Sequence, residues 1–360
     1  MKRMIQTLKY LIRQKTITED KTKNHEVLKW IEKKLVSKFQ TKILHKKGFY
    51  SLIATTQKTK HPKVWLAAHL DVVPGSNEIF IPKEEKGKII GRGAFDMKFA
   101  IACFLKLVEE IKDIQAYNFG IMVTSDEEIG GQNGVKFLLN EQYRSELVFL
   151  PDGCTGESIE REAKGVWHIE AEARGVSTHA SRPWAGKNAI QKLIHFLYEL
   201  EKHTRSESCE DKIHHHNTLN IGKIRGGEAI NKVPHKAVAE LDIRHIPETS
   251  EKEIKTLVRK IAKKHRVEIR EIVYARPTIT NFEDTKIKLY EKIYKEQTGK
   301  RLKRTLSHGS SDARFFHEKG IPVILAQPKG GGHHTEYEWV DIQGLESYYQ
   351  VLKKWLLTIS

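Results

Sequence analysis

The sequence predicts an α/β protein whose mostly parallel sheet is flanked by helices, with a smaller α+β domain inserted into it. At both ends of the chain, buried strand patterns alternate with helical patterns, and polar residues follow the strands. In the middle the pattern becomes strand, helix, two strands, helix and strand. The 360 residues are enough for two domains with separate cores. We expect the first domain at 1–162 and 275–360 and the inserted domain at 163–274.

The run WLAAHLDVVPG at residues 65–75 contains the strand around which the first domain is built. Its apolar first half is typical of a buried strand, and a Pro-Gly break follows. Residues two apart in a strand point to the same face, so His69 and Asp71 can reach one space. A metal-binding imidazole needs its second nitrogen held, which Asp71 can do. A core histidine beside a surface aspartate is the alternative interpretation.

The remaining elements of the first domain follow from the spacing of apolar residues. Helical spacing predicts helices at 1–14, 25–39, 99–111, 286–299 and 342–357. Short apolar runs predict strands at 41–46, 51–56, 64–70, 118–128, 147–153 and 320–328. Because parallel strands end at one edge of their sheet, we expect the polar residues that follow these strands to gather there.

The inserted domain is predicted to be a small sheet with two helices on one face. Its strands are expected at 166–175, 218–227, 237–246 and 267–275, and its helices at 188–203 and 251–265. The triplet His214 to His216 falls between these elements and is interpreted as a polar loop. Adventitious metal binding by the triplet is the alternative.

The formal net charge of +16 raises the question of nucleic-acid binding. Residues 1–50 hold 14 Lys and Arg against 4 Asp and Glu, so +10 of the excess lies there. These lysines follow a helical pattern without interleaved aromatic residues, and no zinc-finger or RNA-binding signature accompanies them. A lysine-rich solvated surface explains this charge, and we expect no specific nucleic-acid partner. A phosphate-binding protein is the alternative from a different functional class.

Targeting signals and cysteine spacing point to the cytoplasm. Polar residues interrupt the N-terminal apolar run, which is therefore not typical of a secretion signal, and no long uncharged apolar stretch predicts a membrane span. The three cysteines are far apart and form no CxxC pair, so they indicate neither a disulfide framework nor a cysteine zinc site: Cys103, Cys154 and Cys209.

Oxygen and nitrogen donors are the chemically informative residues. P-loop, GxGxxG, GxSxG and HExxH patterns are absent from the sequence. The donors that follow the strands are His69, Asp96, Glu127, Glu128, Asp152 and either His333 or His334. Imidazole and carboxylate without thiolate suit a catalytic zinc or a similar divalent ion. Six donors exceed what one ion needs, so two ions that share a carboxylate and a hydroxide are expected, with one carboxylate left to carry protons.

Six motifs together resemble one known family. These are His69-x-Asp71, GRGAFDMK (91–98), SDEEIGG (125–131), PDG (151–153), GGEAINKVP (226–234) and HHTEYEWVD (333–341). They are similar to the di-zinc amidohydrolases and exopeptidases that include aminoacylase, acetylornithine deacetylase, succinyl-diaminopimelate desuccinylase and carboxypeptidase G. The resemblance covers nearly the whole chain. It implies a zinc-exopeptidase-like catalytic domain and an inserted ferredoxin-like lid and dimerisation domain.

The resemblance also implies a role for each residue of the catalytic domain. One ion would be held by His69, Asp96 and Asp152, and the other by Asp96, Glu128 and His334, with His333 as the alternative last ligand. Asp71 would orient His69, and Glu127 would be the general base and acid. The Asp96–Met97 peptide would be cis.

Further residues would complete the site. By resemblance, His179 would stabilise the oxyanion in the partner's site of a homodimer, and Asn231 and Arg244 would contact the substrate. Ser310 and Asp312 lie in a stretch, 307–316, that resembles a substrate-binding loop. We therefore expect a metal-dependent hydrolase of amide bonds in small N-acyl amino acids, with zinc as its ion and cobalt or manganese as alternatives. A dipeptidase or aminopeptidase of the same family is the alternative function.

Overall fold

The computed structural model describes residues 1–153, 157–204 and 214–360, so Cys154 and Cys209 lie outside the described residues. The chain forms two compact units. Unit 1 contains Met1–Arg161, Thr280–Thr305 and Ser311–Ser360, and unit 2 contains Glu162–Ile279 and Leu306–Ser310. Unit 2 therefore extends past the predicted boundary at residue 274. The reason is strand pairing, because β13 (Thr278–Ile279) pairs with Ala163 and Glu162.

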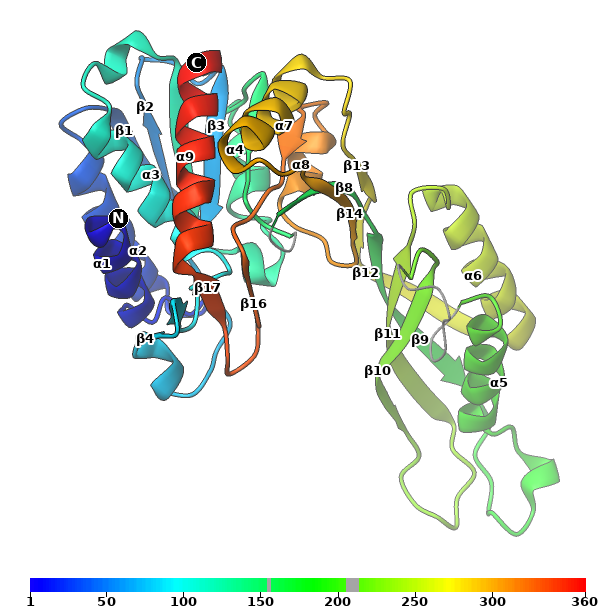
Figure 1. The fold of residues 1–360 in the computed structure, drawn as a ribbon. Coiled ribbons are helices and arrows are strands. Elements are labelled where there is room, and N and C mark those ends of the chain that lie inside the picture. Colours follow the sequence, from blue (N-terminus) through cyan, green and yellow to red (C-terminus); the bar gives the residue numbers. More distant parts are fainter. Residues whose placement is uncertain (154–156, 205–213) are drawn as a thin grey trace. The chain divides into compact units, whose positions relative to one another are not determined.

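The central sheet of unit 1 has six strands in the order β1-β2-β6-β3-β7-β15 (Figure 1). Their bounds are β1 Gln40–Lys46, β2 Phe49–Thr55, β3 Val64–His69, β6 Phe119–Thr124, β7 Leu147–Phe149 and β15 Val323–Ile324. Strands β6, β3, β7 and β15 are parallel, whereas β1 and β2 form an antiparallel hairpin at one edge. The two turn residues of this hairpin, Lys47 and Gly48, both have positive φ, as a type I′ turn requires. The predicted mostly parallel α/β sheet is confirmed.

Five helices of unit 1 overlap the predicted ranges, whereas two short helices, α4 and α8, were not predicted. Their bounds are α1 Lys2–Arg13, α2 Lys21–Leu35, α3 Lys98–Glu110, α4 Val135–Asn140, α7 Thr285–Thr298, α8 Ala313–His317 and α9 Ile342–Ile359. Helix α2 begins four residues before the predicted start at 25, because the Asp20 carboxylate accepts a hydrogen bond from the Lys23 amide and caps the helix. Helix α2 packs on β2 and α3 packs on β3.

Two small sheets were not predicted. Most of their strands have only two or three residues, and the two longer ones, SIEREA (158–163) and KRTLS (303–307), consist mainly of polar residues without an apolar run. One contains β16 (Gly330–Gly331), β17 (Trp339–Asp341), β5 (Lys88–Ile90) and β4 (Lys83–Glu85). The other contains β13, β8 (Ser158–Ala163) and β14 (Lys303–Ser307). The first of these sheets connects the loop after β5, which carries Asp96, with the segment that carries His334.

Unit 2 is a four-stranded antiparallel sheet in the order β10-β11-β9-β12. Its elements are β9 Gly165–Arg174, α5 Ala189–Glu201, β10 Thr218–Gly226, β11 Lys236–His245, α6 Glu251–His265 and β12 Val267–Ala275. Alternate residues of β9, including Trp167 and Ile169, share one core with Phe196 of α5 and Val258 of α6. Both helices therefore cover the same face of the sheet. This chain order is that of the split βαβ fold, which confirms the predicted ferredoxin-like domain.

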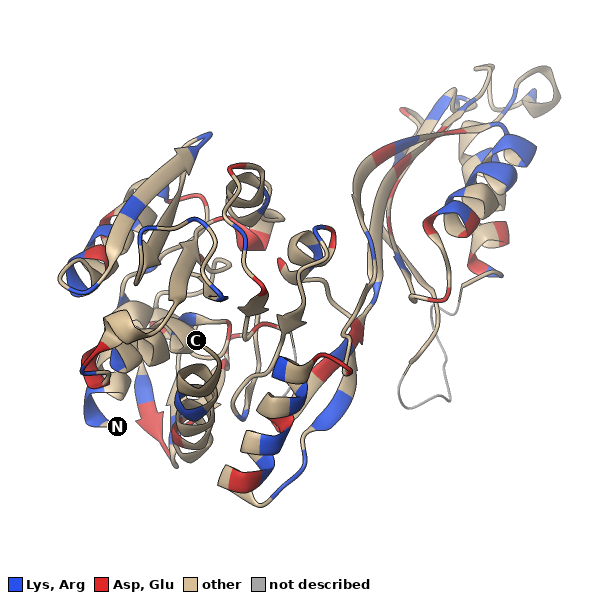
Figure 2. Ribbon diagram, turned by 90° about the horizontal axis from the view of Figure 1, so that it is seen from above, with Lys and Arg blue, Asp and Glu red and all other residues tan. Residues whose placement is uncertain are grey.

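Charged residues of both signs are interleaved along the helices (Figure 2). Ion pairs such as that of Lys264 with Glu199, at 2.8 Å, link neighbouring helices of unit 2. This distribution suits the solvated surface that was inferred from the composition. Across the described part of the chain, the helices are too short or too polar to traverse a lipid bilayer. The cytoplasmic location stays a prediction.

Helices α3 and α9 are joined by a carboxylate whose protonation links stability to pH. Glu110 accepts hydrogen bonds from Lys106 and Tyr349, both at 2.6 Å, and from Lys353 at 2.7 Å. Partial burial opposes ionisation, but these three donors lower the pKa of Glu110 to about 2. Because the pKa is lower in the folded state, the stabilisation is present above the unfolded value and is lost as the pH falls toward 2.

We therefore predict that Glu110→Gln lowers the free energy of unfolding at pH 7 by about 1 kcal/mol, allowing for solvent screening of this partly exposed group. The difference from the wild type should shrink as the pH falls from about 4.5 toward 2. Urea titrations at both ends of this range measure it, with Glu109→Gln, an exposed neighbour 3.8 Å from Arg3, as the control. An equal loss at both pH values would contradict the prediction.

Candidate metal centre

The candidate site lies at the carboxyl edge of the parallel strands of unit 1. His69 is the last residue of β3 and pairs in register with Thr124, the last residue of β6. Leu66 of β3 pairs with Phe149, the last residue of β7. The segments after these strands therefore leave the sheet at one edge, and they carry the predicted donors.

His69 is fixed by a main-chain carbonyl. Its ring is 2% exposed, and Nδ1 lies 3.0 Å from the carbonyl oxygen of Asp71. Because a carbonyl can only accept, Nδ1 carries a proton and Nε2 points to the Asp96 carboxylate, 3.0 Å from Oδ1. The Asp71 carboxylate, which was expected to orient this ring, is 3.7 Å from Nδ1.

The Asp71 carboxylate instead holds the backbone that carries the glutamates. Its Oδ2 accepts hydrogen bonds from Thr18 Oγ1 at 2.9 Å and from the Glu128 amide at 3.2 Å, and its Oδ1 accepts from the Glu127 amide at 3.3 Å. The Asp71 carboxylate is therefore hydrogen-bonded to these three donors and not to the imidazole of His69. Burial raises the pKa of Asp71 to about 6. Thr18 was not identified from the sequence, since it belongs to no motif.

The Asp96 carboxylate lies between two histidines. One oxygen is 3.0 Å from His69 Nε2, and the other is 3.3 Å from His334 Nε2. His334 Nε2 is also 3.0 Å from Glu128 Oε2. Hydrogen bonds to Asp96 and Glu128 raise the pKa of His334 to about 10. A carboxylate with one oxygen directed to each of two imidazoles has the geometry of a bridging ligand.

His333 and His334 point to different surroundings. The ring of His333 packs near Phe95, with 5.8 Å between the ring centroids, whereas His334 joins the carboxylate cluster. Both residues lie in a turn in which His334 has φ +61, and their rings are inclined at 80° to each other, so they face different neighbours. Of the two histidines left open by the sequence, the structure brings His334 to the cluster.

Two overlapping groups of donors share His69. One group is His69, Asp96 and Glu128, and the other is His69, Glu127 and Asp152; in each, the ligand atoms lie within 4.8 Å of one another. The resemblance implied Asp152 beside His69 and Asp96. The structure brings Glu127 into this half of the cluster as well.

The cluster holds more negative charge than its surroundings balance. Burial, together with the charge of Asp96, raises the pKa of Asp152 to about 7. Burial and the charge of Asp152 raise the pKa of Glu127 well above its usual value. Burial also raises the pKa of Asp312 to about 7, although Arg314 lies close. Bound cations would relieve this repulsion.

The donors fit divalent cations. Oε1 of Glu128 is buried and has no hydrogen-bond partner within the described ranges, so a cation is the natural partner for it. Imidazole nitrogens and carboxylate oxygens without thiolate match the ligands of catalytic zinc. The same ligands also suit cobalt and manganese.

A buried ion pair supports the loop that carries Asp96. Arg92 and Glu338 are 2% and 0% exposed, and Arg92 Nη1 donates to Glu338 Oε2 at 2.9 Å. Glu338 Oε1 accepts from the amides of Phe95 and Asp96, each at 2.9 Å. The Asp96–Met97 peptide is cis, as the resemblance implied. Glu338 and Arg92 lie within the motifs HHTEYEWVD and GRGAFDMK, but neither residue was assigned a role from the sequence.

Asp312 lies beneath the loop that carries the two glutamates. It is 2% exposed and packs against Gly131, where a Cβ atom would come within 1.9 Å of Asp312 Oδ1. Gly131 has φ +60, so glycine serves both the conformation and the close approach. Arg314 Nη2 donates to the Gly130 carbonyl at 2.9 Å. The position of Asp312 indicates support of this loop, and its contact with substrate stays a prediction.

Unit 2 carries the other predicted residues. His179 is exposed, and its Nδ1 accepts a hydrogen bond from the Ser181 amide at 3.2 Å, which leaves Nε2 to donate. The Asn231 carbonyl accepts from the Ala180 amide at 2.9 Å, so Asn231 lies beside His179. Arg244 on β11 makes two hydrogen bonds to Asp242, at 2.8 and 2.9 Å.

The segment Leu306–Ser310, and with it Ser310, also belongs to unit 2. The predicted site residues are thus divided between the two units.

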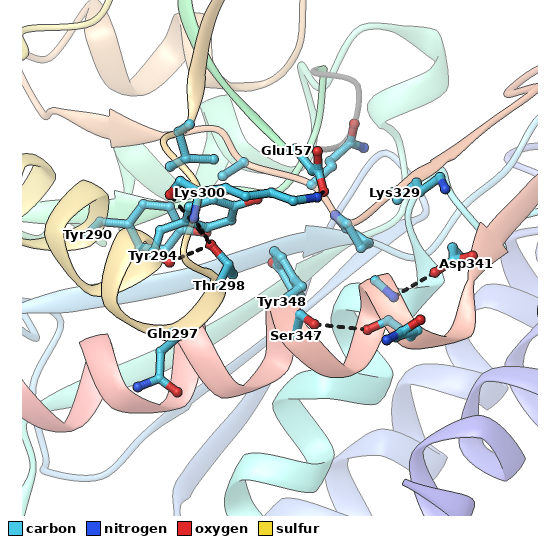
Figure 3. A pocket seen from close by; sticks show the side chains of 16 residues that line it. Glu157, Tyr290, Tyr294, Gln297, Thr298, Lys300, Lys329, Asp341, Ser347 and Tyr348 are labelled. Carbon is cyan, nitrogen blue, oxygen red and sulfur yellow. Dashed lines mark hydrogen bonds and ion pairs between the residues drawn. The ribbon is translucent and has the colours of Figure 1, made fainter.

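A cavity of about 400 Å³ in unit 1 is separate from this cluster (Figure 3). Tyr290, Tyr294 and Thr298 of α7 line it opposite Ser347 and Tyr348 of α9. Its lining, which lies entirely within the described chain, contains none of the candidate ligands.

Several polar groups that line this cavity are hydrogen-bonded within the protein. Lys300 Nζ donates to Glu157 Oε1 at 2.5 Å, and Asp341 Oδ1 accepts from the Gly344 amide at 2.7 Å. The cavity therefore carries no ligand assignment.

Known proteins resemble this chain over most of its length. The chain is 26% identical over 331 residues to a succinyl-diaminopimelate desuccinylase of Sulfurovum sp., covering 88% of this chain and 89% of the relative. Its fold matches a tripeptidase of Staphylococcus aureus with a TM-score of 0.81 at 21% identity, covering 99% and 98% of the two chains. It also matches a Bacillus subtilis peptidase described as dinuclear metal binding, with a TM-score of 0.71 at 16% identity, covering 99% and 98%.

The profile of peptidase family M20/M25/M40 matches residues 65–358. This range includes all the candidate metal ligands of unit 1, from His69 to His334. The chain therefore belongs to peptidase family M20/M25/M40, a family of metal-dependent enzymes, and is a hydrolase of amide or peptide bonds.

Proposed function

We propose that the protein hydrolyses the amide bond of small N-acyl amino acids, as a deacetylase or desuccinylase does, with two divalent ions. The observation that carries this proposal is the Asp96 carboxylate, whose oxygens lie 3.0 and 3.3 Å from the imidazoles of His69 and His334. The desuccinylases of Sulfurovum sp. and Nitratiruptor sp., 26% and 25% identical to this chain, support the substrate class.

We assign His69, Asp96 and Asp152 to one ion and Asp96, Glu128 and His334 to the other. When bound, such ions polarise the amide carbonyl and lower the pKa of water. Zinc suits these donors, and cobalt and manganese are the alternatives. The main-chain carbonyl of Asp71 sets the tautomer of His69. The Asp71 carboxylate accepts hydrogen bonds from the backbone amides of Glu127 and Glu128 and so positions both glutamates.

Glu127 is assigned as the residue that carries the proton. Burial and the nearby Asp152 raise its pKa, which suits a carboxylate that takes a proton from water and later gives it to the leaving amine. The amide of Glu127 is fixed by Asp71, so its side chain starts from a defined backbone position.

The residues of unit 2 are assigned to the substrate. His179 Nε2 would donate to the developing oxyanion and Asn231 would contact the carbonyl. Arg244 would bind the free carboxylate, for which it must share or release Asp242. Ser310 and Asp312 would contact the remaining part of the substrate. A homodimer in which His179 serves the partner's site is part of this proposal.

Hydrolysis of short peptides is the alternative, because structures of the same fold include a tripeptidase of Staphylococcus aureus and an aminopeptidase of Bacillus cereus. The deciding experiment compares kcat/KM for N-succinyl and N-acetyl amino acids, dipeptides and tripeptides with zinc, cobalt or manganese added. We expect at least about tenfold preference for an N-acyl amino acid, which corresponds to about 1.4 kcal/mol. Preference for a peptide with a free amino terminus would favour the alternative.

Replacement of the proton carrier should separate metal binding from turnover. We predict that Glu127→Gln retains two ions per chain by elemental analysis while kcat falls at least about a hundredfold, since an amide cannot accept the proton. Glu128→Gln is the matched comparison and should lose metal. Near-normal turnover of Glu127→Gln, or one ion per chain in the active wild type, would contradict the assignment.

The buried ion pair beneath Asp96 should tune metal affinity. We predict that Glu338→Gln weakens zinc affinity about 10–100-fold, because it disturbs the two amides that position Asp96 and leaves Arg92 without its charge partner. Competition with a chelator measures the affinity, and circular dichroism verifies folding.

Glu336→Gln is the control. Glu336 lies two residues before Glu338, but its carboxylate is exposed and accepts a hydrogen bond from Ser76 Oγ at 2.7 Å instead of from the backbone at Asp96. Equal affinities in the wild type and Glu338→Gln would refute the support role.

The proposed dimer predicts complementation between inactive variants. His179→Ala should lower kcat by about a hundredfold with little change in KM, because an oxyanion donor acts on the transition state. Mixing His179→Ala with Glu127→Gln should restore activity, since one site of the mixed dimer then has both intact residues. Absence of recovery despite verified subunit exchange, or full activity of a monomer, would reject the exchange of His179 between subunits.

A further inference from the structure

We propose that unit 2 contains its own divalent cation site, formed by Glu162, His215 and Glu248. One ligand atom of each residue lies within 4.8 Å of the other two. Glu162 is at the end of β8, His215 precedes β10, and Glu248 lies between β11 and α6. All three belong to unit 2, whereas the catalytic candidates for metal belong to unit 1.

The spacing of the three ligand atoms suits an ion. His215 Nε2 is 3.5 Å from Glu162 Oε1 and 3.2 Å from Glu248 Oε2. Four ligands at about 2.0–2.1 Å from a tetrahedral zinc are about 3.3–3.4 Å from one another. An N–H···O hydrogen bond is shorter, at about 2.9–3.0 Å. The observed distances are therefore close to those between ligands of one small ion.

Burial and charge favour the same conclusion. The side chains of Glu162 and His215 are 7% and 22% exposed, and that of Glu248 is 60% exposed. A buried carboxylate is costly unless a positive charge compensates it. A divalent ion bound between the two carboxylates would offset both negative charges. The exposed side of Glu248 leaves a path for the ion and room for water as a further ligand.

His214 and His216 flank His215 in the chain, and their neighbourhood contains a further imidazole, that of His308. The ring of His214 lies 6.2 Å from that of His216 and 6.0 Å from that of His308, between centroids. Burial and the charge of Lys164 lower the pKa of His308, so this ring is neutral at pH 7 and can bind a metal. These rings are additional nitrogen ligands. The competing hypothesis is therefore that an ion in unit 2 is bound by histidines alone.

The site would stabilise unit 2. Its ligands come from three segments that lie far apart in the sequence, so the unfolded chain cannot present them together. An ion that binds only the folded state stabilises that state by mass action. This role is independent of amide hydrolysis.

The test counts ions in the full-length protein. Wild type and variants are loaded with zinc, freed of excess ion by gel filtration and analysed for zinc per chain. We expect Glu162→Gln, His215→Ala and Glu248→Gln each to hold one zinc fewer than the wild type. The matched control is His235→Ala, an exposed histidine of unit 2 that lies 3.8 Å from Glu228, and it should hold as many as the wild type.

The expected difference of one ion does not depend on how many ions the catalytic centre binds. If this difference is not observed, the proposed function is unaffected. Equal zinc content in the wild type, Glu162→Gln and Glu248→Gln would overturn the proposal. So would loss of the ion in His214→Ala and His216→Ala without loss in Glu162→Gln. Should His215→Ala fail to fold, Glu248→Gln decides the question, because its exposed side chain can be changed without disturbing the core. Added zinc should also raise the thermal unfolding midpoint of the wild type more than that of Glu248→Gln.

Discussion

The position of the Asp96 carboxylate between His69 and His334 is the interaction on which the site of unit 1 depends. The two imidazoles come from segments that are far apart in the chain, and this carboxylate contacts both of them. Around it, Glu127, Glu128 and Asp152 concentrate negative charge in a buried space. The free-energy cost of that concentration explains why several of these carboxylates have raised pKa values, and why the site suits cations.

Such a cluster must be held by groups that do not themselves bind metal. The Arg92–Glu338 pair fixes the backbone at Asp96, and Thr18 with Asp71 fixes the backbone of the glutamates. Each of these supports is buried, so loss of one partner would leave a desolvated polar group unpaired. The rigidity of the site therefore comes from polar contacts outside the ligand set as much as from the sheet edge.

Unit 2 has a much smaller hydrophobic core than unit 1. Its sheet is covered on one face by α5 and α6, and that single layer of helices gives it a small core. The chain enters this unit at Glu162 and also passes through it at residues 306–310, so several segments meet near its end. A bound ion at Glu162, His215 and Glu248 would join three of these segments without enlarging the core. If both proposals hold, divalent cations would serve catalysis in unit 1 and stability in unit 2.

By itself, the sequence determined the elements with strong periodicity and the chemical type of the site. Helix α6 has the bounds that its spacing predicted, and the donors after the parallel strands meet because such strands end at one edge. Only the tertiary structure decided which groups touch. It directed His334 rather than His333 to the cluster and gave the orientation of His69 to a carbonyl. It also paired Arg244 with Asp242 and gathered Glu162, His215 and Glu248. The reason is that periodicity is set by neighbours along the chain, whereas these contacts join distant segments through packing and competing hydrogen bonds.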